Sequence, residues 1–237
     1  GYNMFTYPWL NDIHEAWGVF VEHSHRLLAA VVGMITIVLT AWLWFGDDRR
    51  WLRWLGVVAL GLVILQGVLG GVRVLRVDRV MAVVHGCLAQ VFFSLMVCLA
   101  LFTSRFWKEA AAAVEVSDAS RVQRLALITT ILAFLQLVLG AVLRHLGLEA
   151  ALFAHLAVAF LVVLHVGLVA RRILIGHSSL AALVLPIEFL VLLVAMQLML
   201  GAGAWGTSSG FGPFALQAPT GAQVFFATSH VAVGALI

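Results

Sequence analysis

Four histidines stand at matching places along this 237-residue chain, each near the start of a long apolar stretch: His25, His85, His155 and His230. An ionisable side chain within a membrane span is costly and marks a functional site by default. Imidazole is the usual axial ligand of haem iron, and cofactor sites in helix bundles are built by side chains that face inward from neighbouring helices. The four histidines therefore predict two haem-sized sites, one from the first pair and one from the second.

A repeated motif precedes three of these histidines. The pattern Gln-x-x-Leu-Gly-small occurs at residues 66–71, 136–141 and 197–202. The glutamine leads the next histidine by 19 residues in the first two copies and by 33 in the third, as an insertion at 201–222 predicts. Small residues let helix backbones approach closely in lipid, which is an alternative and sufficient role for the glycines. The offsets indicate two similar four-helix halves, a kind of repeat common in membrane proteins.

Other roles for a single histidine stay open. A hydrogen bond to a neighbouring carbonyl explains any one of them, whereas four at the same depth in a repeat favour haem ligation. A structural metal is less favoured, because cysteine ligands are absent and carboxylates are sparse at this depth. The two cysteines, Cys87 and Cys98, are 11 residues apart in one apolar run, about 16 Å along a helix, which is too far for a disulfide.

Glu22 distinguishes the first site from the others. It precedes His25 by three residues, so both project from one face of a helix, whereas alanine or leucine stands at the matching position of the other three sites. A carboxylate beside one site only predicts chemistry there and electron storage or transfer at the other. An ion pair with Arg26, one turn later, is an equally good interpretation.

Composition requires membrane helices to position these side chains. The chain is 63% hydrophobic and 11% charged, against about 45–50% and about 25% in soluble domains, which excludes a soluble globule. A spanning helix needs roughly 20 apolar residues. Seven such stretches are predicted, at 21–45, 55–75, 80–103, 123–145, 151–170, 178–200 and 223–237. The predicted fold is an all-α integral membrane protein of two pseudo-symmetric four-helix bundles, with seven of eight helices visible, the first expected before residue 1 and the last incomplete.

The charges predict a boundary and an orientation. The polar stretch 104–122 divides the chain into halves at 1–112 and 113–237. Nine of the 14 Lys and Arg residues lie in the connections 46–54, 104–124 and 171–177, which the positive-inside rule places in the cytoplasm. The histidine sites are then expected toward the outer face. A net charge of +3, scattered along the chain, predicts no nucleic-acid partner.

In their order and spacing, these motifs resemble the haem A synthase family, membrane enzymes that oxidise haem O to haem A for cytochrome oxidase. The resemblance covers almost the whole chain from residue 22 onward. It rests on Glu22-His23-Ser24-His25-Arg26, Gln66–Gly71, His85-Gly86, Gln136–His145, His155 and His230.

The resemblance implies a role for each site. His25 and His85 would surround a substrate haem in the half 1–112, with Glu22 as a catalytic carboxylate, and His155 and His230 would hold a haem b cofactor in the half 113–237. Arg144 and His145, at the end of the 123–145 segment, are candidates for a haem propionate, and a solvated helix end is the alternative for them.

The implied reaction converts a ring methyl of haem O to the formyl group of haem A through an alcohol, with Glu22 relaying protons. The implied setting is the lipid bilayer of the bacterial cytoplasmic membrane. The expected partners are haem O, haem O synthase and cytochrome oxidase assembly factors, with a homo-oligomer or a larger respiratory assembly as the expected state.

One departure from the family keeps alternatives open. Many bacterial members carry a cysteine pair in the first outer loop, and residues 1–20 contain none. A non-catalytic haem-binding assembly subunit is one alternative, and a di-haem cytochrome b-type electron carrier is another.

Overall fold

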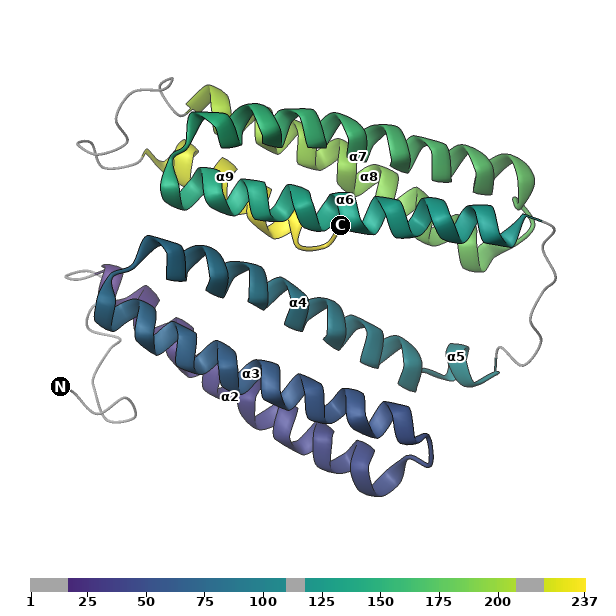
Figure 1. Cartoon of the computed structure of the whole chain (residues 1–237), viewed down its shortest axis with the longest axis horizontal. Helices are drawn as coiled ribbons and strands as arrows, with labels where there is room; N and C mark the ends of the chain where they lie inside the picture. The colour runs from purple at the N-terminus through teal and green to yellow at the C-terminus, as the bar shows by residue number, and fades with distance from the viewer. Residues whose placement is uncertain (1–16, 110–117, 208–219) are drawn as a thin grey trace. The chain divides into compact units, whose positions relative to one another are not determined.

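The computed structural model describes residues 17–109, 118–207 and 220–237, and in these ranges every element is an α-helix. The chain divides into two compact units, Gly1–Ala113 and Val114–Ile237. The N-terminal unit contains α2 (Trp17–Gly46), α3 (Arg50–Arg76), α4 (Arg79–Thr103) and the short α5 (Arg105–Glu109). The C-terminal unit contains α6 (Ala119–Leu146), α7 (Glu149–Gly176), α8 (Ala181–Thr207) and α9 (Gly221–Gly234) (Figure 1).

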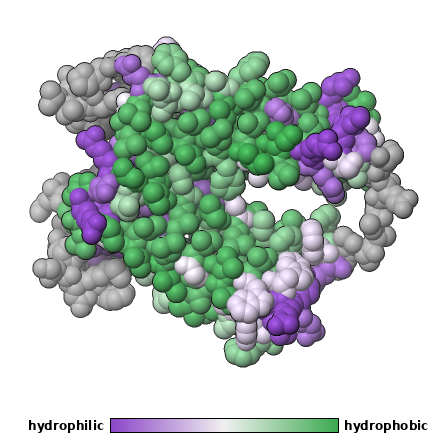
Figure 2. Space-filling model, in the orientation of Figure 1, coloured by the Kyte–Doolittle hydropathy of each residue, from purple (hydrophilic) through white to green (hydrophobic). Residues whose placement is uncertain are grey.

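Six of these helices are long and apolar enough to cross a membrane: α2, α3, α4, α6, α7 and α8. At most 28% of the residues in any of their most apolar windows are buried, so the apolar side chains mostly face outward, as lipid contact requires. Figure 2 shows hydrophobic residues along the helices of each unit and hydrophilic residues near the helix ends. The chain is a multi-pass, all-α membrane protein, which confirms the predicted fold class.

The incomplete last helix expected at 223–237 is present as the 14-residue α9. One predicted boundary differs from the structure, because α8 continues to Thr207, although a loop was predicted from residue 201. Gly201 and Gly203 lie against side chains of α9, and a Cβ at Gly203 would come within 2.4 Å of the Phe226 ring. Glycine here makes room for an aromatic ring instead of ending the helix. Residues 1–16, and 208–219 of that loop, lie outside the described ranges.

In the N-terminal unit, α3 packs against both α2 and α4. The buried residues between them are Leu43, Leu52, Ala59 and Leu99. Gly56 lets α2 and α3 approach closely, because a Cβ there would lie 3.1 Å from Leu43 Cδ1. The Thr40 hydroxyl uses this proximity to donate a hydrogen bond to the Gly56 carbonyl at 2.9 Å.

In the C-terminal unit, each helix packs against the next, α6 on α7, α7 on α8 and α8 on α9. The buried core forms two clusters along these helices. The members are Val169, Ala170, Ile173 and Ile187 in one, and Val162, Val166 and Val194 in the other. Aliphatic contacts therefore hold the helices in register, and polar side chains are left for the helix ends and the histidine sites.

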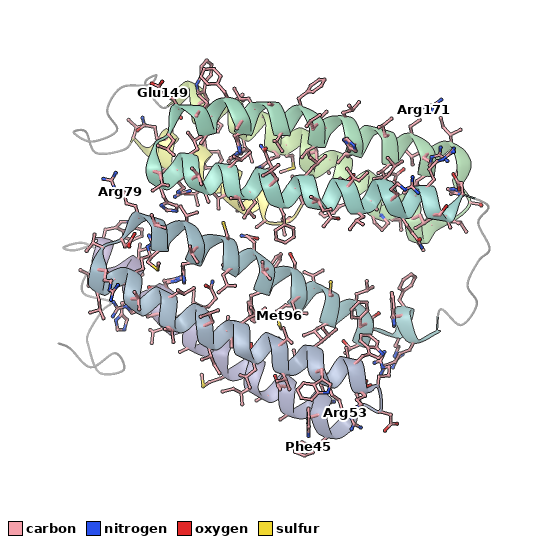
Figure 3. All side chains as sticks on the ribbon, viewed as in Figure 1. Phe45, Arg53, Arg79, Met96, Glu149 and Arg171 are labelled. Atoms are coloured by element: carbon pink, nitrogen blue, oxygen red, sulfur yellow. The ribbon has the colours of Figure 1, made fainter. Side chains whose placement is uncertain are left out.

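Asp47 organises the connection between α2 and α3. The Arg49 guanidinium donates to both carboxylate oxygens, at 2.9 Å from Nε and 2.7 Å from Nη2. Its Nη1 also donates to the Phe102 carbonyl of α4 at 2.9 Å, so the pair links the connection to the end of α4. Figure 3 labels Phe45 and Arg53 at this end of the unit, with Arg79 at the other. Hydrogen bonding from Arg49 lowers the pKa of Asp47 from 3.8 to about 2.

This pKa predicts how stability depends on pH. Because the folded-state pKa is depressed, the stabilisation from Asp47 is present above the unfolded value of about 3.9 and is lost as pH falls through about 2. We expect Asp47→Asn to lower the free energy of unfolding at pH 7 by about 1–2 kcal/mol, measured as a thermal midpoint in detergent. The fall in midpoint between pH 5 and pH 2 should shrink in the variant. Asp48→Asn is the control, because Asp48 is fully exposed and 3.8 Å from Arg53. Equal midpoints for the two variants would contradict the role of Asp47.

Candidate functional site

His155, near the start of α7, is bound at both ring nitrogens by Gln136 of α6. Its Nδ1 lies 3.2 Å from the Gln136 backbone carbonyl oxygen, and its Nε2 lies 3.0 Å from the side-chain amide nitrogen. A carbonyl can only accept, so Nδ1 carries the ring hydrogen and Nε2 accepts from the amide. This assigns the neutral tautomer whose lone pair on Nε2 is the one able to bind a metal.

His230 on α9 repeats this arrangement with Gln197 of α8. Its Nδ1 lies 3.2 Å from the Gln197 carbonyl oxygen, and its Nε2 lies 3.5 Å from the amide nitrogen. The backbone bond is the same in both copies, whereas the amide contact is longer in the second. Both histidines therefore present Nε2 as the ligand atom.

A glycine one turn after each glutamine provides the surface on which the imidazole lies. A Cβ at Gly140 would lie 3.1 Å from His155 Cε1, and a Cβ at Gly201 would lie 2.9 Å from His230 Cε1. In an α-helix the carbonyl of residue i points toward residue i+4, so a second donor reaching it must pass over that residue. In the Gln-x-x-x-Gly spacing, the glutamine provides the carbonyl acceptor and the glycine leaves space for the imidazole. The sequence analysis predicted close helix packing for these glycines and did not include this role.

The two imidazoles lie beside each other. Their ring centroids are 6.3 Å apart, with an angle of 69° between the planes. Two imidazoles bound to opposite sides of one metal ion, through bonds of about 2 Å, place their ring centres about 6 Å apart. The separation of His155 and His230 is therefore compatible with two imidazoles that would hold one haem, and a hydrogen bond from Nδ1 is the usual support of a ligating histidine. Their role as haem ligands stays a prediction. Within the described ranges no three metal-binding side chains cluster together.

The first copy of the repeat, at residues 66–71, lies in the N-terminal unit. A Cβ at Gly70 of α3 would lie 3.3 Å from Cε1 of His85 on α4, so the imidazole lies on the same kind of glycine surface. Its buried Nδ1 faces the backbone of Gln66 without reaching hydrogen-bond geometry. This site has the same three residue types as the other two, with the histidine held less firmly.

His25 is exposed on α2, and with Arg73 it lies within electrostatic range of His85. His25 and His85 are both described and make no ring contact like that of the C-terminal pair. Glu22 forms the ion pair with Arg26, so this interpretation of its role is present in the structure. The Glu22 side chain is still 47% exposed, so the pair leaves its carboxylate accessible. The proposed catalytic role of Glu22 stays a prediction.

Arg144 and His145 lie at the same end of the C-terminal unit as the histidine pair. They follow Gln136 by eight and nine residues on α6, about 12–14 Å further along the helix. Figure 3 labels Glu149 at this end and Arg171 at the opposite end of α7. Contact between Arg144 or His145 and a cofactor stays a prediction. His165, further along α7, hydrogen bonds to the Leu161 carbonyl of its own helix at 2.9 Å, as the carbonyl-bonded interpretation expects.

The three glutamines are the functional residues that sequence reasoning missed. Gln66, Gln136 and Gln197 marked the repeat, and no contact was assigned to them. The available signal was the 19-residue offset from glutamine to histidine, which places the two side chains opposite each other across an antiparallel helix pair.

Comparison with known proteins places this geometry in context. A family model described as cytochrome oxidase assembly protein (COX15-CtaA) matches residues 14–153. The match includes Glu22, His25 and His85, and it ends just before His155. No solved structure matches the chain.

Three similar curated proteins are each named Heme A synthase. The protein from Shouchella clausii is 36% identical over 83 residues, which cover 32% of this chain and 26% of that protein. The one from Lysinibacillus sphaericus is 28% identical over 131 residues, 54% of this chain and 42% of that protein. The one from Geobacillus kaustophilus is 26% identical over 142 residues, which cover 58% of this chain and 43% of that protein. The aligned regions span less than half the length of each relative.

The glycine surface gives a direct test. We expect Gly140→Ala and Gly201→Ala each to lower the free energy of unfolding in detergent by about 1–3 kcal/mol, because the added methyl moves the imidazole away from the glutamine carbonyl. Gly167→Ala on α7 is the control, since its Cβ would meet nothing within 4 Å, and alanine there should be neutral or stabilising by up to about 1 kcal/mol. If all three variants melt alike, the glycines do not hold the imidazoles.

Proposed function

The chain belongs to the family of cytochrome oxidase assembly proteins, and from this premise we propose that it is a haem-dependent membrane oxidoreductase of the haem A synthase type. Its reaction would oxidise a ring methyl of haem O to the formyl group of haem A. The observation that carries the proposal is a difference between two sites built on one repeat. Hydrogen bonds to glutamine close the His155–His230 site. At the His85 site, which we call the open site, the buried Nδ1 faces the Gln66 backbone without a hydrogen bond of that geometry.

The closed site suits a resident cofactor. His155 and His230 would hold haem b through Nε2, with each Nδ1 fixed by a glutamine carbonyl. Bound there, haem b would supply one-electron transfer. The two carbonyl bonds limit rotation of the rings about their side-chain torsions, so the ligand atoms need little rearrangement to bind iron. Arg144 and His145 are the candidates for contact with the haem propionates.

The open site suits a substrate that must later leave as product. His85 lies on Gly70 with its buried Nδ1 outside hydrogen-bond geometry to the Gln66 backbone, so its ring is fixed by fewer hydrogen bonds than those of His155 and His230, and His25 is exposed. Arg73, within electrostatic range of His85, is positioned to attract a propionate. Weakly held imidazoles release a bound haem faster than fixed ones, which a turnover site requires.

Glu22 would be the catalytic carboxylate of the open site. It lies one helical turn before His25, and nearly half of its side chain is accessible. The Arg26 guanidinium holds the carboxylate in place through the ion pair. From this position Glu22 would relay protons to and from the oxygen that reacts at the methyl group.

The charge distribution supports a location in the bacterial cytoplasmic membrane with both sites toward the outer face, because most Lys and Arg residues lie in connections at the other helix ends. Haem O would enter from haem O synthase, and haem A would pass to cytochrome oxidase assembly factors. A homo-oligomer or a larger respiratory assembly would fit this transfer.

The deciding experiment is extraction of the porphyrins from protein purified after expression together with haem O synthase, followed by mass spectrometry. We expect haem b together with haem O, its alcohol intermediate or haem A. Glu22→Gln should retain both haems and lose haem A by at least about tenfold, because general acid–base groups contribute typically 10²–10⁴-fold.

Arg26→Gln is the matched control. It also breaks the ion pair but leaves the carboxylate, so it should retain most haem A formation. Equal loss in Arg26→Gln and Glu22→Gln would assign Glu22 a structural role only. Two low-spin haem b groups with no altered porphyrin in the wild type would instead identify a di-haem electron carrier.

A further inference from the structure

We infer that the side-chain amides of Gln136 and Gln197 occupy the metal-binding position of His155 and His230 while the protein is free of haem, and leave it when iron binds. This inference rests on the proposed haem ligation. It assigns each glutamine two separable tasks, because the backbone carbonyl holds Nδ1 and the side chain serves Nε2.

The glutamine amide satisfies the imidazole and leaves its own oxygen unpaired. Each amide donates to a histidine Nε2, at 3.0 and 3.5 Å, while its own oxygen Oε1 is buried without a partner. The amide is therefore turned to satisfy the imidazole at the expense of its own acceptor. A buried ring nitrogen left unpaired in an apolar setting is destabilising, so the amide stabilises the haem-free site.

The amide hydrogen would compete with iron for Nε2 of each imidazole. Nε2 of the neutral imidazole has one lone pair, and the amide hydrogen and an iron atom need the same one. Both cannot bind at once. The amide is at the end of a flexible side chain and can turn away, whereas the carbonyl that fixes the ring stays in the helix backbone. Binding of iron thus replaces the amide without disturbing the orientation of the imidazole.

The copy of the repeat in the N-terminal unit can be compared with the two copies in the C-terminal unit. Gln66 stands at the same position relative to His85, and within the described residues neither its buried Oε1 nor the Nδ1 of His85 has a hydrogen-bond partner. No amide bond to His85 needs replacing there. The displaceable amide is therefore a property of the closed site, where haem b would be inserted once and retained.

The test compares haem-free and haem-loaded protein in detergent. We expect Gln136→Leu to lower the thermal midpoint of the haem-free form by about 2–6 °C, from the loss of one buried hydrogen bond. The midpoint after reconstitution with haem b should change by less than about 1 °C, and the low-spin bis-histidine absorption and electron paramagnetic resonance spectra should be those of the wild type. Gln123→Leu is the matched control on the same helix, where Gln123 is exposed near the other end, and it should change neither form.

Two results would overturn the inference. Equal destabilisation of both forms would make the amide a packing group, and a changed bis-histidine spectrum or midpoint potential would make it a partner of the bound haem. A wild type that binds no haem b would remove the proposed cofactor instead. That outcome is distinguishable, because it is observed before any variant is compared.

A second, independent observation concerns the opposite end of the C-terminal unit. We propose that a cavity there binds the phosphate headgroup of an anionic phospholipid. The cavity is an open, shallow groove between the start of α6 and the end of α7. Its lining includes Arg121, Arg124, Arg171 and Arg172, with Leu125 and Leu168 on an apolar wall.

The charge in this cavity is not balanced within the described residues. Asp118 is its one acidic lining residue, and it is engaged by Arg172 and by His177 at 2.8 Å. Hydrogen bonding from Arg172 lowers the pKa of Asp118, so it stays ionised and committed to that pair. Among the residues that the structure describes, Arg121, Arg124 and Arg171 have no ion-pair partner, so the described lining of the groove carries more positive than negative charge.

The arginines that contact Asp47 in the connection between α2 and α3 differ from those of this groove. In the N-terminal unit, Arg49 is bound to Asp47 and the Phe102 carbonyl, and Arg53 donates to the Asp47 carbonyl. Guanidinium groups bind phosphate oxygens in pairs. A basic pocket between helices, beside apolar side chains at the end of a membrane span, suits a lipid phosphate with its acyl chains along the apolar wall.

Thermal midpoints in neutral detergent test the site, with phosphatidylglycerol, phosphatidylcholine or inorganic phosphate added. Phosphatidylglycerol should raise the wild-type midpoint by at least about 3 °C more than the other two. The double variant Arg121→Gln/Arg124→Gln should lose this shift, and Arg50→Gln, an exposed arginine of α3, should keep it. An equal shift with inorganic phosphate would indicate a free-anion site, and equal loss in Arg50→Gln would indicate bulk surface charge. Either result overturns the lipid site.

Discussion

The structure depends on how a neutral imidazole is satisfied inside an apolar helix pair. Each ring has one donor and one acceptor, and no water is available in the hydrocarbon region to bind them. The nearest acceptor is a helix carbonyl that already bonds the amide four residues on, so the ring must lie over that fourth residue. Only glycine leaves the space, as the approach of 2.9 Å to a Cβ at Gly201 shows. The repeat of glutamine, glycine and returning histidine follows from this constraint.

The outgoing helices of the repeat end at equal distances from their glutamines. Helices α3, α6 and α8 end at Arg76, Leu146 and Thr207, each ten residues after the glutamine of its repeat. The chain turns back at once after α3 and α6, through left-handed residues Val77 and Gly147. After α8 it returns only at Gly221. The longer connection leaves the glutamine and histidine side by side, because the extra residues lie beyond the helix ends.

The sequence predicted the membrane helices, the repeat and the pairing of His155 with His230, because composition and spacing determine these features. It did not separate the two roles of glycine, since close helix packing and an imidazole surface both require a missing side chain at the same spacing. The role of Glu22 was also left open by the sequence, because spacing places it near both His25 and Arg26. The structure shows the ion pair with Arg26. The end of α8 was misplaced because residues 201–222 were interpreted as one loop, whereas Gly201 and Gly203 lie in the helix and make room for rings of α9.

Residue identity alone cannot explain how two similar sites would serve different purposes. Gln, Gly and His stand in the same order at all three copies, and each imidazole lies within about the same distance of its glycine. The copies differ in whether Nδ1 reaches the carbonyl, which helix spacing decides. They differ also in whether a second imidazole lies opposite, as His230 does for His155. Under the proposed function, the hydrogen bonding of the imidazole and the presence of a second imidazole separate a haem that stays from one that is exchanged, with no change in the repeated residue types.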